Sequence, residues 1–272
     1  MQYKLYTIMF IPSLSSVKSI EKQFQTGEEP LLVVCSNMEA YICKYMRSGS
    51  SAYKLACELA GAIMAHSWNL NTPDIAFVHV RKEHWTGSFS QYISSKPLIG
   101  FKREFGVVDI NPGTFLEVVP SLSVVEQLMD IALFDFWIAN EDRNYNNSNL
   151  MYKVSKQKLV SIDYGCIFNT ATFDYPMSQL TSTDTILYSD LFSHIIVDKS
   201  KQQVNDIVEK LNYELHEKIN RCENSIQLIL KALPSEWLVP LPLVESKLLQ
   251  LFETRWINNV WNNFVECLKE NC

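Results

Sequence analysis

Short apolar runs in the first part of the chain follow a pattern that predicts β-strands. The segment LLVVCSNMEAYICKYM holds two such runs on either side of Ser36 and Asn37. Two runs rich in β-branched and aromatic residues, joined by a short polar segment, are typical of a β-hairpin. Further strands are predicted after Pro73, in DIAFVHV, and in PLIGFKREF, whereas residues 82–97 are polar and irregular.

Two longer segments have apolar residues at the spacing of an α-helix. They are residues 52–68 and 123–139. The second begins with Ser123 and Glu126, whose spacing of three predicts a capping box at its start. The apolar positions are Leu55, Leu59, Ala62 and Ile63 in the first helix, and Leu128, Ile131, Phe134 and Ile138 in the second.

Helical spacing also dominates the last third of the chain. Most of 180–272 is predicted to be helical, with one long helix over 244–268. Between the two halves, VVDINPGTF contains a Pro-Gly turn, and short strands are expected on either side of the turn in VSKQKLVSID. Because strands come first and helices later, the order favours an α+β fold with two unlike lobes.

Composition and charge narrow the class of protein. The chain has 272 residues, of which 47% are hydrophobic and 20% charged, as expected for a globular domain with a substantial core. The formal net charge of −6 argues against a protein that coats nucleic acid, so we expect no direct nucleic-acid binding. No uncharged run of about 20 apolar residues occurs, and we therefore expect no membrane span.

The cysteines indicate a reducing compartment. The seven Cys residues are odd in number, lie largely in apolar runs and form no Cys-x-x-Cys pair, so reduced thiols in a cytoplasmic protein are expected, without a zinc site. The first residues, MQYKLYTIMFIPSL, are interrupted by Pro12 and fit a first strand better than a signal peptide.

The stretch FDFWIANEDRNYNNSNLMY carries the strongest chemical signal. Its apolar helix pattern ends in a cluster of amides and acids, with Asp142 and Asn147 five residues apart. Asp163 follows where the strand-like run KLVSI ends, two residues before a glycine. Magnesium-dependent phosphoryl transfer needs a carboxylate to orient the attacking hydroxyl, and an amide and a second carboxylate to hold the metal ions.

These segments resemble the catalytic and metal-binding segments of the HipA-like kinases, and more closely the small HipA-like branch than the full-length toxins. They are more distantly similar to the phosphatidylinositol kinases. The matching pattern is Asp-Arg-x-x-x-Asn-x-Asn-Leu followed by Ile-Asp-x-Gly; Asn144 and Tyr145 stand where such loops usually have a His or similar residue. The resemblance implies a bilobal protein-kinase-like fold, with a β-rich N-lobe over 1–99 and a mainly helical C-lobe over 100–272.

The resemblance extends to the first half of the chain. Lys44 lies in the predicted strand AYICKYM, and Glu58 lies fourteen residues later on the predicted helix, on the side of Leu55 and Ala62. Burying a carboxylate without a partner is costly, and in kinases a strand lysine pairs with a helix glutamate and with the nucleotide phosphates. We therefore expect Lys44 to contact ATP while Glu58 holds it. The run IGFKREF falls where the adenine-contacting strand would be.

For the site as a whole, the resemblance implies ATP and Mg²⁺ as cofactors. Asp142 would be the catalytic base or orienting group, Asn147 and Asp163 would bind Mg²⁺, and Arg143 would brace the loop. The implied acceptor is a Ser or Thr of a protein. Toxins of the family phosphorylate an aminoacyl-tRNA synthetase, and the resemblance permits a target in the translation machinery and a DNA-binding antitoxin partner here. No glycine-rich loop precedes Lys44, and MRSGSSAY, with Ser48, Ser50 and Ser51, takes its position as a candidate autophosphorylated loop.

Simpler interpretations stand beside these. Asp142 and Asn147 could close a polar turn, Lys44 could be a surface residue, and Glu58 could pair with Lys54 on its own helix. Asn149 is either a second amide near the metal or a turn residue. At the level of function, the alternatives are a pseudokinase that binds nucleotide without transfer, and an interaction protein that docks partners through 82–97 and its helical third.

Overall fold

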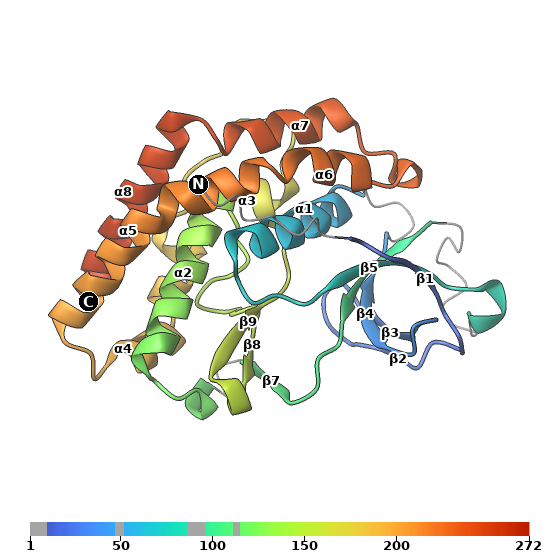
Figure 1. Ribbon diagram of the computed structural model, residues 1–272, viewed down its shortest axis with the longest axis horizontal. Helices are drawn as coiled ribbons and strands as arrows, with labels where there is room; N and C mark the ends of the chain where they lie inside the picture. Colours follow the sequence, from blue (N-terminus) through green and yellow to red (C-terminus); the bar gives the residue numbers. More distant parts are fainter. Residues whose placement is uncertain (1–9, 47–51, 86–95, 111–114, 272) are drawn as a thin grey trace, which may run out of the picture. The chain divides into compact units, whose positions relative to one another are not determined.

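The computed structural model of the protein describes residues 10–46, 52–85, 96–110 and 115–271 (Figure 1). The candidate serines Ser48, Ser50 and Ser51 lie outside these ranges, as do the centre of the Pro-Gly turn and most of the polar segment 82–97. Within the described part of the chain, no helix is both long enough and apolar enough to cross a membrane.

The chain divides into two compact units. One comprises Met1–Ser50 and Asp74–Arg103, and the other comprises Ser51–Pro73 and Glu104–Cys272. This division differs from the expected lobes at the first long helix, α1 (Tyr53–Trp68), which the sequence placed with the N-lobe. The helix groups with the second unit because it packs against helices of that unit.

The first unit is built on a six-stranded sheet, within the described residues, in the order β1-β5-β6-β4-β3-β2. All neighbouring strands are antiparallel except β1 and β5, and the β3–β4 pair confirms the hairpin expected around Ser36 and Asn37. The strands are β1 (Ser13–Ser15), β2 (Lys22–Gln23), β3 (Leu31–Val34), β4 (Ala40–Lys44), β5 (Ile75–His79) and β6 (Leu98–Lys102), and the 3₁₀ helix η1 spans Lys82–His84.

Alternation along the strands builds the core of the first unit. Leu31 pairs with Cys43 and Val33 with Tyr41 across β3 and β4, and all four side chains are buried in one cluster. On the neighbouring strand β6, a Cβ added to Gly100 would lie 2.8 Å from the Val78 side chain. The strand therefore packs too closely there for any larger residue.

The second unit is mainly helical and contains a small sheet. The antiparallel sheet has the order β7-β8-β9, with β7 (Val107–Ile110), β8 (Leu150–Lys153) and β9 (Lys158–Ser161). The remaining helices are α2 (Leu122–Ile138), α3 (Ile167–Ala171), α4 (Asp190–Ile196), α5 (Lys201–Glu223), α6 (Ile226–Ala232), α7 (Leu241–Gln250) and α8 (Thr254–Asn271). In the described part of this unit, the 3₁₀ helices are η3 (Phe115–Glu117), η4 (Val154–Lys156), η5 (Ser182–Asp184), η6 (Ile186–Tyr188) and η7 (Ser235–Trp237).

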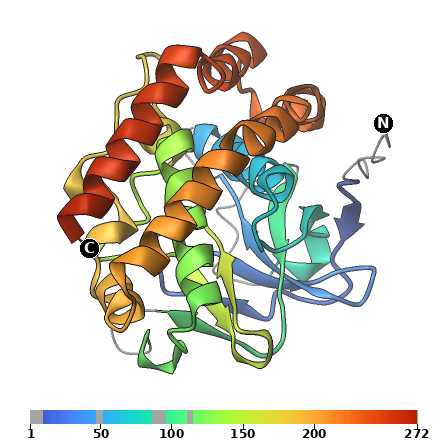
Figure 2. The same cartoon turned by 60° about the vertical axis from the view of Figure 1, so that its left-hand side comes forward.

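Helix α2 lies at the centre of this unit. It contacts α5 and α8, which flank it in Figure 2, and it also contacts α1. Its apolar residues continue around the helix, which is typical of a helix buried on most sides. The indole rings of Trp68 on α1 and Trp137 on α2 lie 5.1 Å apart between centroids. Because α2 is rigidly packed, the loop that follows it has a fixed starting point.

Two details of the expected helices are wrong. Helix α2 begins one residue earlier, at Leu122, and its N-cap Ser121 makes no side-chain cap bond, so Ser123 and Glu126 form no capping box. The long helix expected over 244–268 is two helices, α7 and α8. The break between them is stabilised by tertiary contacts, because the Trp137 indole N–H donates to the Leu251 carbonyl at 2.8 Å.

Candidate active site

The loop that carries the candidate catalytic residues begins where α2 ends. Ala139 caps the helix in the left-handed conformation, with φ 50° and ψ 56°. The backbone N–H of Asn140 then donates to the Asp135 carbonyl at 3.0 Å, and the Asn140 amide donates to the Asp135 carboxylate at 3.0 Å. Both residues are buried, so the loop is tied to the last turn of α2 from its first residues onward.

A buried ion pair braces the loop from below. Arg143 Nε lies 2.7 Å from Asp135 Oδ2, and both side chains are almost fully buried. The guanidinium also donates to the carbonyls of Ser148 and Asn149, and lies 5.8 Å from the centre of the Tyr164 ring. Burial raises the pKa of Asp135 to about 6, and the Arg143 charge and the Asn140 amide limit the rise. The expectation that Arg143 braces the loop is confirmed.

Asp142, which is partly exposed, is held by the side-chain amides of two asparagines. Its Oδ2 accepts hydrogen bonds from Asn149 Nδ2 at 2.8 Å and from Asn147 Nδ2 at 3.1 Å. Its Oδ1 accepts none from any residue that the structure describes. Asn149 has a φ of 45°, a left-handed conformation that asparagine tolerates well. The amide of Asn149, which had two interpretations, therefore orients the Asp142 carboxylate.

The hairpin of β8 and β9 brings Asp163 to the same end of the sheet. Leu150 and Ser161 are paired in the ladder, and beyond them the Ile162 N–H donates to the Asn149 carbonyl at 3.1 Å. Asp163 is the next residue, and its own φ is 64°, an uncommon value for a residue other than glycine. The structure therefore joins the loop of Asp142 to Asp163 through Asn149.

Glu58 lies beside this end of the hairpin. Its Oε2 accepts the backbone N–H of Tyr164 at 3.0 Å, so the helix α1 supports the residue directly after Asp163. One turn further along α1, Gly61 allows this approach, because a Cβ there would lie only 2.4 Å from the Tyr164 Cβ. The Tyr164 hydroxyl, also buried, donates toward Ser161 and Thr72.

Lys44 lies on β4 in the first unit. Its ammonium is 3.2 Å from the Glu28 carboxylate, a partner that sequence reasoning missed. The only signal in the sequence is the pair Glu28-Glu29 just before a predicted strand. The pairing of Lys44 with Glu58, which belongs to the second unit, stays a prediction.

The backbone after Asp163 is strained. Four consecutive residues, Phe168 to Ala171, have φ values between 53° and 57°, and none of them is glycine. They make up all of α3 after its first residue, so α3 is not a regular right-handed helix. The left-handed conformation costs about 1–2 kcal/mol per residue and normally occurs as single residues. We call this segment the left-handed turn. Such conformations persist only where surrounding contacts hold them, and they concentrate at functional sites.

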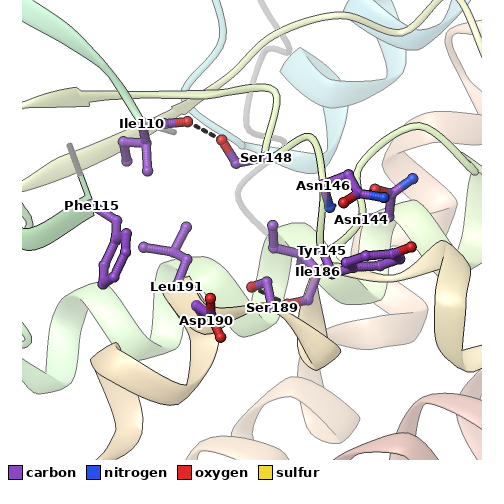
Figure 3. Close-up of a pocket in the computed structure, with 10 residues that line it drawn as sticks. All are labelled: Ile110, Phe115, Asn144, Tyr145, Asn146, Ser148, Ile186, Ser189, Asp190 and Leu191. Carbon is purple, nitrogen blue, oxygen red and sulfur yellow. Dashed lines mark hydrogen bonds between the residues drawn. The ribbon is translucent and has the colours of Figure 1, made fainter. Parts of the chain in front are cut away.

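A small pocket of about 30 Å³ opens beside the loop (Figure 3). Asn144, Tyr145 and Asn146 border it from the loop, and Ser189, Asp190 and Leu191 border it from the start of α4. Its wall also includes the apolar side chains of Ile110, Phe115 and Ile186. The pocket is therefore mostly apolar, with one carboxylate from Asp190.

The side-chain oxygen atoms of this region are of the chemical kind that a magnesium ion binds. Carboxylate and amide oxygens are the donors that Mg²⁺ prefers. Asp163 offers a carboxylate, and the Asn147 amide donates through its nitrogen to Asp142, which leaves its carbonyl oxygen for a cation.

Sequence reasoning missed the structural role of the buried acid Asp135. The sequence did contain a signal for it, because an aspartate within the apolar helix pattern of 123–139 needs a partner for the same reason as Glu58.

One strand-rich unit and one mainly helical unit give the chain an α+β fold. In agreement, a solved structure of a Helicobacter pylori proinflammatory kinase, CtkA, matches with a TM-score of 0.58 at 12% sequence identity, covering 94% of this chain and 99% of that one. A Golgi casein kinase structure matches with a TM-score of 0.43 at 10% identity, covering 93% of this chain and 73% of the other. The match to the CtkA structure confirms the expected fold class.

The family follows from a match over most of the chain. The family model for HipA-like kinases matches residues 17–263, and the chain belongs to that family. No protein of curated function matches the sequence. Membership of this family supports a phosphotransferase, and the resemblance seen in the loop and in Asp163 is confirmed at the level of the family.

Proposed function

We propose that the protein is an ATP- and magnesium-dependent kinase that phosphorylates a Ser or Thr hydroxyl of a protein. The observation that carries this proposal is the arrangement at Asp142, whose Oδ2 takes hydrogen bonds from Asn147 and Asn149. Two neutral donors orient the carboxylate without cancelling its charge. The other oxygen then remains available to accept the proton of an acceptor hydroxyl.

The remaining residues have roles in the same scheme. Asn147 and Asp163 would hold Mg²⁺, and Lys44, supported by Glu58, would contact the nucleotide phosphates. When bound, Mg²⁺·ATP supplies the phosphoryl group and neutralises part of its charge. The protein contributes by holding the acceptor hydroxyl in line and by keeping its own charges in place, since phosphoryl transfer depends mainly on positioning and electrostatics.

The family and the pocket beside the loop both bear on the acceptor of the phosphoryl group. The family supports a protein substrate, and the pocket beside the loop has room for only a small group, with apolar walls and one acid. A toxin role, with a target in the translation machinery and an antitoxin partner, extends the proposal along the family resemblance. The identity of the protein that the kinase labels, in the experiment below, decides whether the target belongs to the translation machinery.

Radiolabelled ATP and Mg²⁺, added to a host-cell lysate with the wild type or with Asp142→Ala, test the proposal. A band labelled only by the wild type supports transfer and identifies a substrate candidate. Equal labelling by the two proteins contradicts the role of Asp142. Mass spectrometry of the purified protein after incubation with ATP tests Ser48, Ser50 and Ser51 in the same experiment.

A thermal-shift measurement separates the alternatives. A ligand that binds only the native state raises the unfolding midpoint. A shift with ATP and Mg²⁺ but no labelled product would indicate a nucleotide-binding pseudokinase. If neither ATP nor Mg²⁺ shifts the midpoint, an interaction protein without a nucleotide site is the better description.

A further inference from the structure

We propose that Glu141 is a positioning residue that fastens the loop of Asp142 to the left-handed turn after Asp163. Its Oε1 accepts a hydrogen bond from Asn169 Nδ2 at 2.8 Å, and its Oε2 accepts one from Thr170 Oγ1 at 2.6 Å. We call these three residues the Glu141 clasp. Both donors belong to the left-handed turn, 28 and 29 residues away in the chain.

A backbone hydrogen bond also joins the left-handed turn to the start of the loop. The N–H of Asn169 donates to the Ala139 carbonyl at 3.0 Å, so the turn contacts the loop both before and at Glu141. Side-chain and backbone bonds together leave the turn little freedom relative to the loop. The proposal rests on the proposed function, because the purpose of this contact is to place Asp142.

The Glu141 clasp also stabilises the left-handed turn. Its left-handed backbone is unfavourable for non-glycine residues and must be held by contacts. Asn169 supplies several of them, since its Oδ1 accepts the Ser178 N–H at 2.8 Å and its carbonyl accepts the Thr172 hydroxyl at 2.5 Å. Asparagine also tolerates the left-handed conformation better than most residues. Asn169 therefore both permits the turn and connects it to the loop.

Glu141 lies next to Asp142 and is bound on its backbone as well. Its carbonyl accepts the amide of Asn144 at 2.9 Å, and Asn144 in turn shares backbone bonds with Asn147. A displacement at Glu141 is therefore transmitted to both Asp142 and Asn147. A shift of about 1 Å in a positioned group can cost about a hundredfold in rate, even where binding of the reactants is unaffected.

Three substitutions distinguish the effect of losing the clasp hydrogen bonds from the effect of changing the backbone conformation of the turn. Glu141→Ala removes the acceptor. Asn169→Gly removes the amide but keeps a residue that adopts the left-handed conformation easily. Glu141→Gln is the conservative variant, because its Oε1 can accept from Asn169 while its Nε2 donates to the Thr170 hydroxyl. Glu217→Ala, which removes an exposed partner of Arg221 on α5, serves as the control.

Amide hydrogen exchange and steady-state kinetics are measured on the full chain. We expect Glu141→Ala and Asn169→Gly to accelerate exchange of the backbone amides in 142–149 by about tenfold or more, and the double variant to add little. In the same two variants kcat for phosphoryl transfer falls by about tenfold to a hundredfold, while KM for ATP stays within about threefold. Glu141→Gln and Glu217→Ala retain wild-type exchange and kcat.

Unchanged exchange in 142–149 for both Glu141→Ala and Asn169→Gly overturns the clasp, whether or not the protein transfers phosphate. Loss of kcat in Glu141→Ala without faster exchange in 142–149 also overturns it, because Glu141 would then affect transfer in some way other than by fastening the loop. If the wild type transfers nothing, the proposed function fails, and the exchange experiment alone decides whether the clasp holds the loop.

Discussion

The loop region contains two acids, one buried and one partly exposed, whose partners differ in charge. We call the buried acid and its partner the inner layer, and the partly exposed acid and its partners the outer layer. In the inner layer, Asp135 and Arg143 form an ion pair 2.7 Å apart and buried on both sides. In the outer layer, the partly exposed Asp142 is held by the neutral amides of Asn147 and Asn149. A buried carboxylate requires an opposite charge, because leaving it unpaired costs several kcal/mol. An exposed carboxylate has no such need.

The comparison indicates what each layer is for. Cationic partners neutralise the inner acid and make it a structural element. Amide partners fix the direction of the outer acid and leave its negative charge available to a metal ion or an acceptor hydroxyl. Substitutions in the outer layer should therefore change activity with little loss of stability, and substitutions in the inner layer should change stability first.

The largest expected effect is on activity, in the outer layer. We expect Asp142→Ala to lower the rate of phosphoryl transfer by about 10²–10⁴-fold, because it removes the group that we propose as the acceptor of the hydroxyl proton. Its free energy of unfolding should stay within about 1 kcal/mol of the wild type, since only two partly exposed hydrogen bonds are removed. Initial rates with labelled ATP and urea unfolding measure the two quantities. A large loss of stability would erase the distinction between the layers.

Asp163→Ala sharpens the assignment within the outer layer. It should remove magnesium-dependent ATP binding as well as transfer, whereas Asp142→Ala should keep the binding. Calorimetric titration of ATP with and without Mg²⁺ measures the difference. Asp206→Ala on α5, an exposed acid bonded only to Gln202 in the described residues, is the matched control and should bind as the wild type does. Equal binding by Asp163→Ala and the wild type would contradict a metal role for Asp163.

In the inner layer, Arg143→Met should cost about 3–5 kcal/mol of unfolding free energy, because it leaves the Asp135 carboxylate buried without its cation. The double variant Asp135→Asn/Arg143→Met should recover part of that loss, since no buried charge remains. Urea unfolding of the three proteins measures both effects. Lys210→Met, which breaks the exposed pair with Glu126, should cost less than about 1 kcal/mol. Similar costs for the buried and the exposed pair would contradict the inner layer's structural role.

The inner layer also predicts how stability depends on pH. The pKa of Asp135 is raised from 3.8 to about 6 on folding, so between these values the native protein binds more protons than the unfolded chain. The contribution of this group to stability is therefore greatest below about pH 4 and falls as pH rises to about 6, by up to about 3 kcal/mol. The double variant lacks this group, and the difference between its unfolding curves and those of the wild type should show the fall. A difference that is constant with pH would exclude it.

Sequence reasoning selected candidate residues that are close along the chain. In the structure Asn147 is hydrogen-bonded to Asp142, and Ile162, next to Asp163, is bonded to Asn149 of the same loop; the catalytic and metal-binding roles of these residues stay predictions. Sequence reasoning did not recover contacts that depend on packing. The Trp137 bond that stabilises the break between α7 and α8, and the Asn169 bond to Glu141, both join residues far apart in the chain. No local periodicity records either contact.

The grouping of α1 with the second unit depends on packing in the same way. The pattern of apolar residues over 52–68 predicted a helix correctly, but periodicity cannot say which neighbours bury it. The structure supplies that information at Gly61, where α1 touches Tyr164. A glycine within a helix is unfavourable by itself, and the close approach of a second segment explains its presence.

Gly61→Ala tests whether this close approach supports the inner layer. The added Cβ would lie 2.4 Å from the Tyr164 Cβ, in a place where backbone and ring must shift. We expect a loss of about 1–3 kcal/mol in unfolding free energy, after the gain of up to about 1 kcal/mol that alanine brings to a helix. Gly27→Ala is the control, because a Cβ there meets no atom within 4 Å. Since Tyr164 also packs against Arg143, the Gly61 variant should accelerate amide exchange in the loop, and unchanged exchange would show that α1 and the loop are independent.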